Sequence, residues 1–311
     1  MSGKIVNPEE AVKLAYVSKR YFKDFVPRTE IADELGLSRF AVARMIQKAL
    51  ELGVVTITID APGPVDVDLS LRLASRFGLQ NAFVARTATG DREVIRVTLG
   101  RLAADVLSGM IAEDDIVGLT AGRTLIEMSR ALGEVPSCDV VQLTGVADPV
   151  RERGTEAVNT MARRSGGAVY PLHAPFAATD AAARATIMAQ PGIRPSLARL
   201  DRLTKAVVTL GAWPDDSLLH DSLEPSGEAR RLVRRGIVAE IGTTLLDADG
   251  REIDLLTDRV IGIRTAQLRR VAQVIGIGGG RRKHAAIKAV LASGLLSHLI
   301  TDEETARYLL A

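Results

Sequence analysis

Residues 116–125 read IVGLTAGRTL, a short apolar run that ends in small and hydroxyl residues. The apolar run predicts a buried strand, and the amphipathic pattern that begins at Arg123 predicts a helix directly after it. The first backbone N–H groups of such a helix have no partner within it, so they and the helix dipole can hold an anion. Thr120, Gly122, Arg123 and Thr124 are therefore candidate anion contacts. The alternative is an ordinary strand-to-helix turn that Thr120 caps.

The same alternation of apolar and amphipathic stretches continues along most of the chain. Further short apolar runs predict strands at 82–85, 139–143, 168–170, 206–210, 260–263, 274–277 and 298–300. Amphipathic stretches predict helices at 92–111, 123–132, 155–164, 228–235, 282–293 and 303–310. Continuously apolar strands separated by helices indicate an α/β, Rossmann-like fold, in which helices cover both faces of a parallel sheet.

A second candidate anion site lies in the segment 276–283, which reads GIGGGRRK. Its glycines, among them Gly279 and Gly280, permit close approach of a ligand to the backbone. Three positive charges that end at Lys283 oppose the dipole of the helix they begin, which is tolerated beside an anion or where the charges reach solvent. Arg281 stands where a dinucleotide-binding fingerprint needs its third glycine, so that motif is excluded.

Ligands of open parallel sheets bind beyond the carboxyl ends of the strands, so we expect both segments to lie at one edge. Gln142 ends a third predicted strand and offers a polar group there. Asp247 belongs to an Asp-Gly turn, 247–250, and its carboxylate can accept hydrogen bonds from sugar hydroxyls. The alternative for this turn is a plain surface loop.

Residues 28–47 fit a helix-turn-helix. Ala32 is the small residue needed where the two helices cross, Gly36 forms the turn, and Ser38 is the expected N-cap of the second helix. Apolar residues occupy the positions expected to be buried, namely Ile31, Leu35, Leu37, Val42 and Met45.

The outward face of the second helix is basic, since residues 38–50 hold three Arg or Lys side chains and no acidic one. Arg and Gln can read base edges in a major groove, whereas Lys more often holds phosphate. The alternative is a helical hairpin with a solvated charged face. The candidate DNA contacts are Ser38, Arg39, Phe40, Arg44, Gln47 and Lys48.

Composition limits the class of protein. The chain has 311 residues, of which 47% are hydrophobic and 25% charged, and these values exclude a disordered chain. Its one cysteine, Cys138, cannot close an internal disulfide, which favours a reducing, cytoplasmic location. No apolar run approaches the ~20 residues of a membrane helix, so we expect no membrane partner. The four histidines lie far apart, and we expect neither a metal nor a cofactor.

Two prolines and a glycine mark residues 60–66 as a linker. It divides a helix-turn-helix domain, 1–59, from a larger α/β domain, 67–311. Within the first domain, partial alternation over 54–59 predicts a short strand.

Several blocks of the sequence carry a resemblance that covers nearly the whole chain. They are VG with GRTL at 117–125, DVVQL at 139–143, YPLHAP at 170–175, LDADG at 246–250, DRVIGI at 258–263, GGRRKHAAI at 279–287 and LITDEETA at 299–306. In this order, behind a helix-turn-helix, they resemble the SorC family of bacterial transcriptional regulators, also called the deoxyribonucleoside-regulator type.

The resemblance implies an effector domain similar to sugar-phosphate isomerases, a phosphorylated sugar or polyol as effector, and a homodimer or homotetramer on palindromic operator DNA. Ala121 departs from relatives that carry a bulky aromatic residue there. The implied phosphate contacts are Thr120, Gly122, Arg123 and Thr124, with Lys283 as charged partner and with Asp247 and Gln142 on the sugar.

The competing reading is an enzyme similar to a sugar-phosphate isomerase. Such an enzyme needs a base beside the bound sugar, and Asp247 with Asp249 is the only suggestive pair. The DNA-binding module favours a regulator instead, so we assign no catalytic residue.

Overall fold

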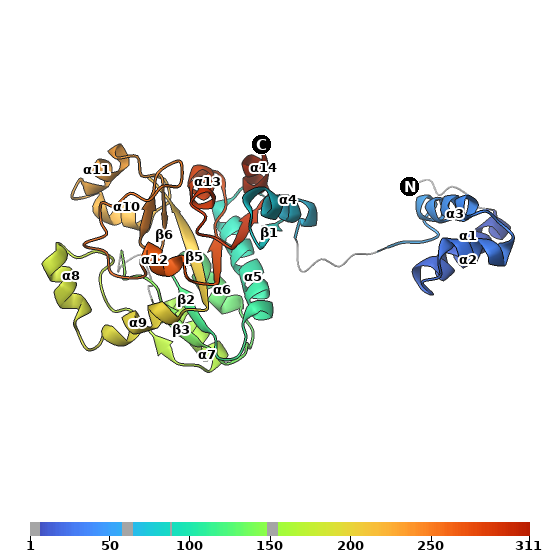
Figure 1. Cartoon of the computed structure of the whole chain (residues 1–311). Helices are drawn as coiled ribbons and strands as arrows, with labels where there is room; N and C mark the ends of the chain where they lie inside the picture. Colours follow the sequence, from blue (N-terminus) through green and yellow to red (C-terminus); the bar gives the residue numbers. More distant parts are fainter. Residues whose placement is uncertain (1–6, 58–64, 88, 148–154) are drawn as a thin grey trace. The chain divides into compact units, whose positions relative to one another are not determined.

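The computed structural model describes residues 7–57, 65–87, 89–147 and 155–311. The chain divides into two compact units, residues 1–60 and residues 61–311, and each is described by itself (Figure 1).

In its described residues, 7–57, the N-terminal unit contains α1 (Pro8–Phe22), α2 (Arg28–Leu35) and α3 (Arg39–Glu51). Gly36 takes the left-handed conformation, with a φ of 62°, and so ends α2 and makes the predicted turn. Ser38 caps α3 as predicted, because its Oγ accepts a hydrogen bond from the Ala41 N–H at 3.2 Å.

The core of this unit differs in part from the prediction. Ile31, Ala32 and Val42 are buried as expected, but Leu35 and Leu37 are 39% and 42% exposed. Helix α1 packs against α3 and contributes Val17 to the core. The helix-turn-helix pattern covers only α2 and α3, so it did not predict this contribution.

The strand predicted at 54–59 is wrong over its described part. Residues 54–57 form a bend followed by irregular backbone, and no described segment of this unit pairs with them as a second strand. Residues 58 and 59, and most of the predicted linker 60–66, lie outside the described residues.

The second unit is built on a parallel sheet whose strands run in the order β1-β9-β8-β5-β2-β3-β4. This arrangement confirms the predicted α/β fold. The strands are β1 (Asn81–Ala85), β2 (Ile116–Leu119), β3 (Asp139–Gln142), β4 (Val169–Tyr170), β5 (Lys205–Ala212), β8 (Gln273–Ile277) and β9 (His298–Asp302).

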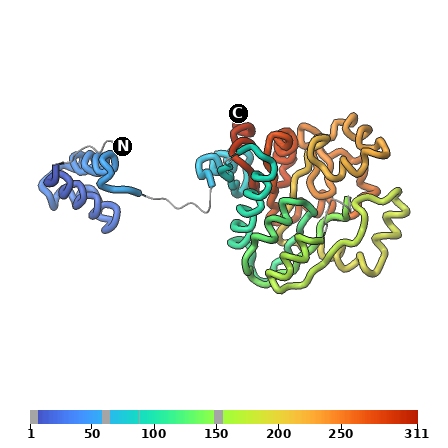
Figure 2. The backbone as a smooth tube through the Cα atoms, turned by 180° about the vertical axis from the view of Figure 1, so that it is seen from behind, coloured from blue at the N-terminus to red at the C-terminus, as the bar shows by residue number. Residues whose placement is uncertain are grey.

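Helices cover both faces of this sheet. One core contains residues of α4 (Val67–Phe77), α13 (His284–Ala292) and α14 (Glu303–Leu310). The opposite core contains residues of α5 (Arg92–Met110), α6 (Arg123–Ala131) and α7 (Glu156–Ser165). Within β5, Ala206 and Val208 face the first core while Val207 faces the second, so a continuously apolar strand is buried on both sides. Helix α14 packs against α4 although most of the unit's sequence separates them (Figure 2).

Beyond β5 the chain departs from simple alternation. The antiparallel strands β6 (Ala239–Ile241) and β7 (Thr244–Leu246) pair with each other, and β6 also pairs antiparallel with the carboxyl end of β5. The described part of this unit also contains α8 (Ala181–Met188), α9 (Arg194–Arg199), the 3-10 helix η1 (Leu200–Arg202), α10 (Leu218–Leu223), α11 (Glu228–Arg234) and α12 (Thr265–Leu268).

The strand predicted at 260–263 is wrong. Val260 and Gly262 form only isolated bridges, to Ala177 and Thr144. Gly262 has a φ of 150°, and a Cβ atom there would lie 2.5 Å from the Leu143 carbonyl oxygen. The segment therefore crosses the end of β3 at close range instead of joining the sheet.

No helix in the described parts of the chain is long and apolar enough to cross a membrane.

Candidate functional site

A cavity of about 400 Å³ lies at the carboxyl ends of β2, β5 and β8. The beginnings of α5, α6 and the short 3-10 helix η2 (Arg281–Lys283) contribute to its wall, as does the turn between β5 and α10. Both predicted anion segments thus meet at one edge of the sheet. The predicted residues that line the cavity are Thr120, Gly122, Arg123, Thr124, Gly279, Gly280 and Lys283.

The N-terminus of α6 is open toward this cavity. Gly122 occupies its N-cap position and offers no side chain to cap the first N–H groups. A Cβ atom at Gly122 would lie 2.7 Å from Cγ2 of Thr209 on β5, so glycine is required for this packing. The Thr120 hydroxyl accepts a hydrogen bond from the Thr209 N–H at 3.0 Å, and Thr120 is 5% exposed. Thr120 therefore fixes the loop onto β5.

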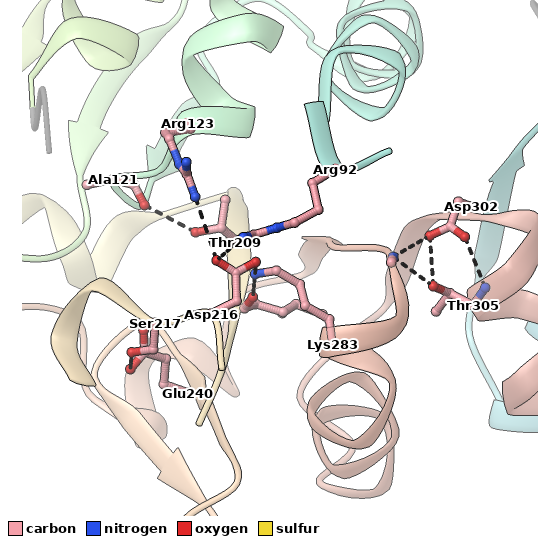
Figure 3. A network of polar contacts seen from close by, with 12 residues as sticks. Arg92, Ala121, Arg123, Thr209, Asp216, Ser217, Glu240, Lys283, Asp302 and Thr305 are labelled. Carbon is pink, nitrogen blue, oxygen red and sulfur yellow. Dashed lines mark hydrogen bonds and ion pairs between the residues drawn. The ribbon is translucent and has the colours of Figure 1, made fainter. Parts of the chain in front are cut away.

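A buried carboxylate holds the second segment. Asp302, at the end of β9, accepts a hydrogen bond from the Gly280 N–H at 2.7 Å and another from the Thr305 hydroxyl at 2.7 Å (Figure 3). A Cβ atom at Gly279 would lie 2.2 Å from the same carboxylate. The glycines allow the loop to close onto Asp302, and this closure sets the start of η2 and with it Lys283.

Three cations converge on one carboxylate, that of Asp216 (Figure 3). Its Oδ1 lies 2.9 Å from a guanidinium nitrogen of Arg92 and 3.7 Å from one of Arg123. Its Oδ2 lies 3.5 Å from Nζ of Lys283, which also donates a hydrogen bond to the Leu210 carbonyl oxygen.

Burial and charge act in opposite directions on this cluster. Burial raises the pKa of the Asp216 carboxyl, but the charges of Lys283, Arg92 and Arg123 outweigh it and lower the pKa below its ordinary value. Burial lowers the pKa of Lys283, and the nearby carboxylates of Asp216 and Glu240 compensate only in part. The site therefore holds an ionised carboxylate beside a desolvated Lys283 and two more exposed arginines.

Sequence reasoning missed Arg92, Asp216 and Glu240, all of which line the cavity. Glu240 accepts hydrogen bonds from the indole N–H of Trp213 at 2.6 Å and from the Ser217 hydroxyl at 2.9 Å. Asp216 follows the predicted strand 206–210 within a few residues, so the rule that ligands bind at strand ends is the one signal that could have led to it.

Two predicted sugar contacts do not line the cavity. Gln142 is fully buried, and its amide donates to the Thr144 carbonyl at 2.8 Å and accepts from the Leu172 N–H at 3.1 Å. Asp247 accepts hydrogen bonds from the backbone N–H groups of Asp249 and Arg251 within its own turn. Both side chains stabilise local backbone, because each strand end or turn has N–H groups that need an acceptor.

The predicted DNA contacts lie together on α3 and at its start, and all are exposed, namely Ser38, Arg39, Phe40, Arg44, Gln47 and Lys48. The Arg39 guanidinium lies 4.9 Å from the centre of the Phe40 ring. Lys48 forms an ion pair with Glu10 of α1 at 2.5 Å, and Gln47 bonds to Glu51 at 3.2 Å.

No group of three or more His, Cys, Asp and Glu residues suited to a metal ion occurs among the residues that the structure describes.

A helix-turn-helix unit joined to an α/β unit with a charged cavity at the carboxyl edge of its sheet is typical of ligand-binding transcriptional regulators. Residues 65–311 match the family described as "Putative sugar-binding domain". The chain belongs to the SorC family of regulators that carry this domain.

Named relatives and solved structures agree with this assignment. The chain is 30% identical to "Uncharacterized transcriptional regulator YjhU" of Escherichia coli (strain K12), over 94% of this chain and 92% of that protein. It is 29% identical to the erythritol catabolism regulatory protein EryD of Brucella abortus (strain 2308), over 93% of each chain. The crystal structure of the full-length sorbitol operon regulator SorC from Klebsiella pneumoniae shares the fold, with a TM-score of 0.73, 23% identity, and 97% of this chain and 100% of that chain covered. These relatives are named as regulators and not as enzymes.

Proposed function

We propose that the protein regulates transcription of a carbohydrate or polyol catabolic operon, and that a phosphorylated sugar or polyol in the cavity controls its affinity for operator DNA. The observation that carries the proposal is the convergence of Arg92, Arg123 and Lys283 beside the open N-terminus of α6. Guanidinium groups, an ammonium group and free helix N–H groups are the donors that phosphate oxygens take.

The sugar end of the ligand then points toward the rest of the cavity wall. Ser217, Glu240 and Thr144 line that wall and supply hydroxyl and carboxylate oxygens. Such groups accept and donate the hydrogen bonds that sugar hydroxyls need. The names of relatives support this ligand class, since they refer to erythritol catabolism, deoxyribonucleosides and a sorbitol operon.

For DNA, we propose that α3 enters a major groove with Arg39, Arg44 and Gln47 toward the bases and Lys48 toward phosphate. A homodimer or homotetramer would place two such helices on a palindromic operator, because the two-fold symmetry of the protein matches that of the site. The effector acts by linkage: it changes operator affinity by the ratio of its affinities for the DNA-competent and DNA-incompetent arrangements.

The alternative, a sugar-phosphate isomerase, has weaker support. The suggestive pair, Asp247 and Asp249, is not among the residues that line the cavity. Asp216, which does line it, is held by three cations that lower its pKa, and so it is a poor proton acceptor.

Thermal unfolding of the full chain against a panel of sugars and polyols, each with and without phosphate, tests the proposal. A ligand at about 100 times its Kd adds about 2.7 kcal/mol to the free energy of unfolding. We expect only phosphorylated compounds to raise Tm, and we expect the best of them to change the affinity for operator DNA. Stabilisation by unphosphorylated compounds alone would contradict the assignment of the cationic end.

A further inference from the structure

The Asp216 carboxylate lies where the proposed function needs an anion from the ligand. Its two oxygens divide the cations between them, with both arginines at Oδ1 and Lys283 at Oδ2 (Figure 3). A bound phosphate would present its oxygens to the same nitrogen atoms. Two anions that share these cations at contact distance repel each other, so the ligand and Asp216 compete for them.

The turn that carries Asp216 is anchored at both of its ends. The Asp216 N–H donates to the Ala212 carbonyl at 2.7 Å, and the Ala212 N–H donates to the Asp216 carbonyl at 3.0 Å. The next residue, Ser217, caps α10 through the His220 N–H at 3.0 Å. The backbone therefore holds the Asp216 carboxylate close to the cations. The carboxylate can move away from them only by rotation of the Asp216 side chain.

We propose that Asp216 is an internal counter-anion that determines the ligand specificity of the cavity. It neutralises the cations in the ligand-free site, so a ligand binds only when its own anionic group takes those cations over. This inference rests on the proposed function and deepens it.

The exchange selects ligands by charge. A phosphate monoester carries close to two negative charges and three acceptor oxygens, whereas the Asp216 carboxylate carries one charge and two oxygens. A sugar carboxylate carries one charge and two oxygens, and so gains little over Asp216 itself. A neutral polyol has no charge to exchange. The preferred class is therefore phosphate monoesters, and sugar acids are rejected.

Asp216→Asn tests the exchange, because asparagine keeps the shape and removes the charge. Asp215→Asn is the matched control, since Asp215 is the adjacent residue, is exposed and does not line the cavity. The probes are inorganic phosphate and gluconate, titrated calorimetrically into the full chain. We expect Asp216→Asn to bind phosphate at least about tenfold more tightly than wild type, because a like charge at contact distance has been removed. We also expect it to acquire measurable affinity for gluconate, while Asp215→Asn remains like wild type.

Unchanged or weaker phosphate binding by Asp216→Asn would overturn the inference, and a loss of sugar-phosphate binding alone would make Asp216 a hydroxyl acceptor instead. Asp216→Ser supplies a second neutral variant if the first does not fold, and the same outcomes apply to it. If wild type binds a sugar phosphate and Arg123→Ala loses it, the proposed function stands whatever Asp216→Asn does. If neither wild type nor the neutral variants bind any phosphate compound, both proposals fail.

A readout of the turn comes from Trp213, the only tryptophan of the chain. It lies in the same turn, is 5% exposed and donates its indole N–H to Glu240. Release of Asp216 alters the charge near this ring, so we expect saturating phosphate to change Trp213 fluorescence in wild type. Asp216→Asn has no carboxylate to release, so we expect saturating phosphate to change its Trp213 fluorescence much less than that of wild type. A change of the same size in Asp216→Asn and in wild type would contradict displacement.

Discussion

Replacement of Lys283 by methionine separates the binding role of this residue from its structural one. Methionine keeps an unbranched stem of similar length but removes the ammonium group, which bonds to the Leu210 carbonyl and lies 3.5 Å from Asp216. A hydrogen bond from a charged donor contributes about 1.5–3 kcal/mol. If a ligand phosphate takes that bond, its loss weakens binding by about 10- to 150-fold.

The stability of the unliganded protein should change much less. Removal of the ammonium leaves the Leu210 carbonyl without this donor, which costs about 1–3 kcal/mol. The same change also removes a charge whose burial is unfavourable, as its lowered pKa shows, and this offsets part of the cost. We therefore expect Tm to fall by only a few degrees, while the affinity falls by an order of magnitude or more.

The assay is calorimetric titration of the full chain with the phosphorylated compound that most raises its Tm. Lys288→Met is the matched control, because Lys288 lies on α13, the helix that begins directly after Lys283, is exposed and is absent from the cavity wall. We expect the control to bind like wild type. A folded Lys283→Met protein that binds the compound as tightly as wild type would refute the role of Lys283 as a ligand contact.

Three further outcomes are expected. Gly122→Ala should weaken effector binding at least about tenfold in the same titration, since its Cβ would lie 2.7 Å from Thr209. Gly109→Ala is the control, because a Cβ there meets open space, and it should bind the effector like wild type. Equal Kd values for the two variants would contradict the packing argument. Arg44→Ala should weaken operator binding by about 1–3 kcal/mol in a fluorescence anisotropy assay and leave effector binding unchanged, and an unaltered operator Kd would remove Arg44 from the interface. Because burial lowers the pKa of Lys283, affinity for a phosphate ester should fall as pH rises through that pKa, below the ordinary lysine value of 10.5, and Lys283→Arg should hold its affinity to higher pH. A Kd that changes with pH in the same way in wild type and in Lys283→Arg would mean that the charge of Lys283 does not contribute to binding.

Most of the sheet could be predicted because its strands are continuously apolar. The runs at 116–119 and 274–277 mark strands buried on both faces, and the helices that follow begin within a few residues of their predicted starts. The hairpin of β6 and β7 was not predicted, because each strand has three residues, too few to show a periodic pattern of apolar residues. The run at 260–263 looked like a strand because burial alone makes it apolar. Its glycine instead lets it cross the end of β3 as a loop.

The candidate site was predictable where it depends on local chain geometry. Strand-to-helix junctions with glycines and hydroxyls led to Gly122 and Lys283, because the free N–H groups at a helix N-terminus can bind an anion. Arg92 and Asp216 depend on strand order instead. Strand β5 lies between β2 and β8, so the turn that follows β5 falls between the two predicted segments. A sequence of that turn, WPDDS, gives no sign of its neighbours. Gln142 shows the converse case: it ends a strand at the predicted edge, but its amide hydrogen-bonds to the backbone of Thr144 and Leu172 and does not line the cavity.

The charge balance of the cavity links its specificity to its response. With Asp216 in place, an incoming anion gains only the difference between its own bonds to the three cations and those that Asp216 gives up. That difference is small for a carboxylate and larger for a phosphate ester, so discrimination arises without any contact to the sugar. The same exchange releases the Asp216 carboxylate on the turn before α10. Binding of an anion to the three cations therefore moves the Asp216 side chain while the backbone of its turn stays anchored. A ligand can bias operator affinity only through contacts that differ between two arrangements, and the release of Asp216 is such a difference. A neutral compound has no charge to exchange and leaves Asp216 on its cations, and for that reason it should neither raise Tm nor change the affinity of the protein for DNA.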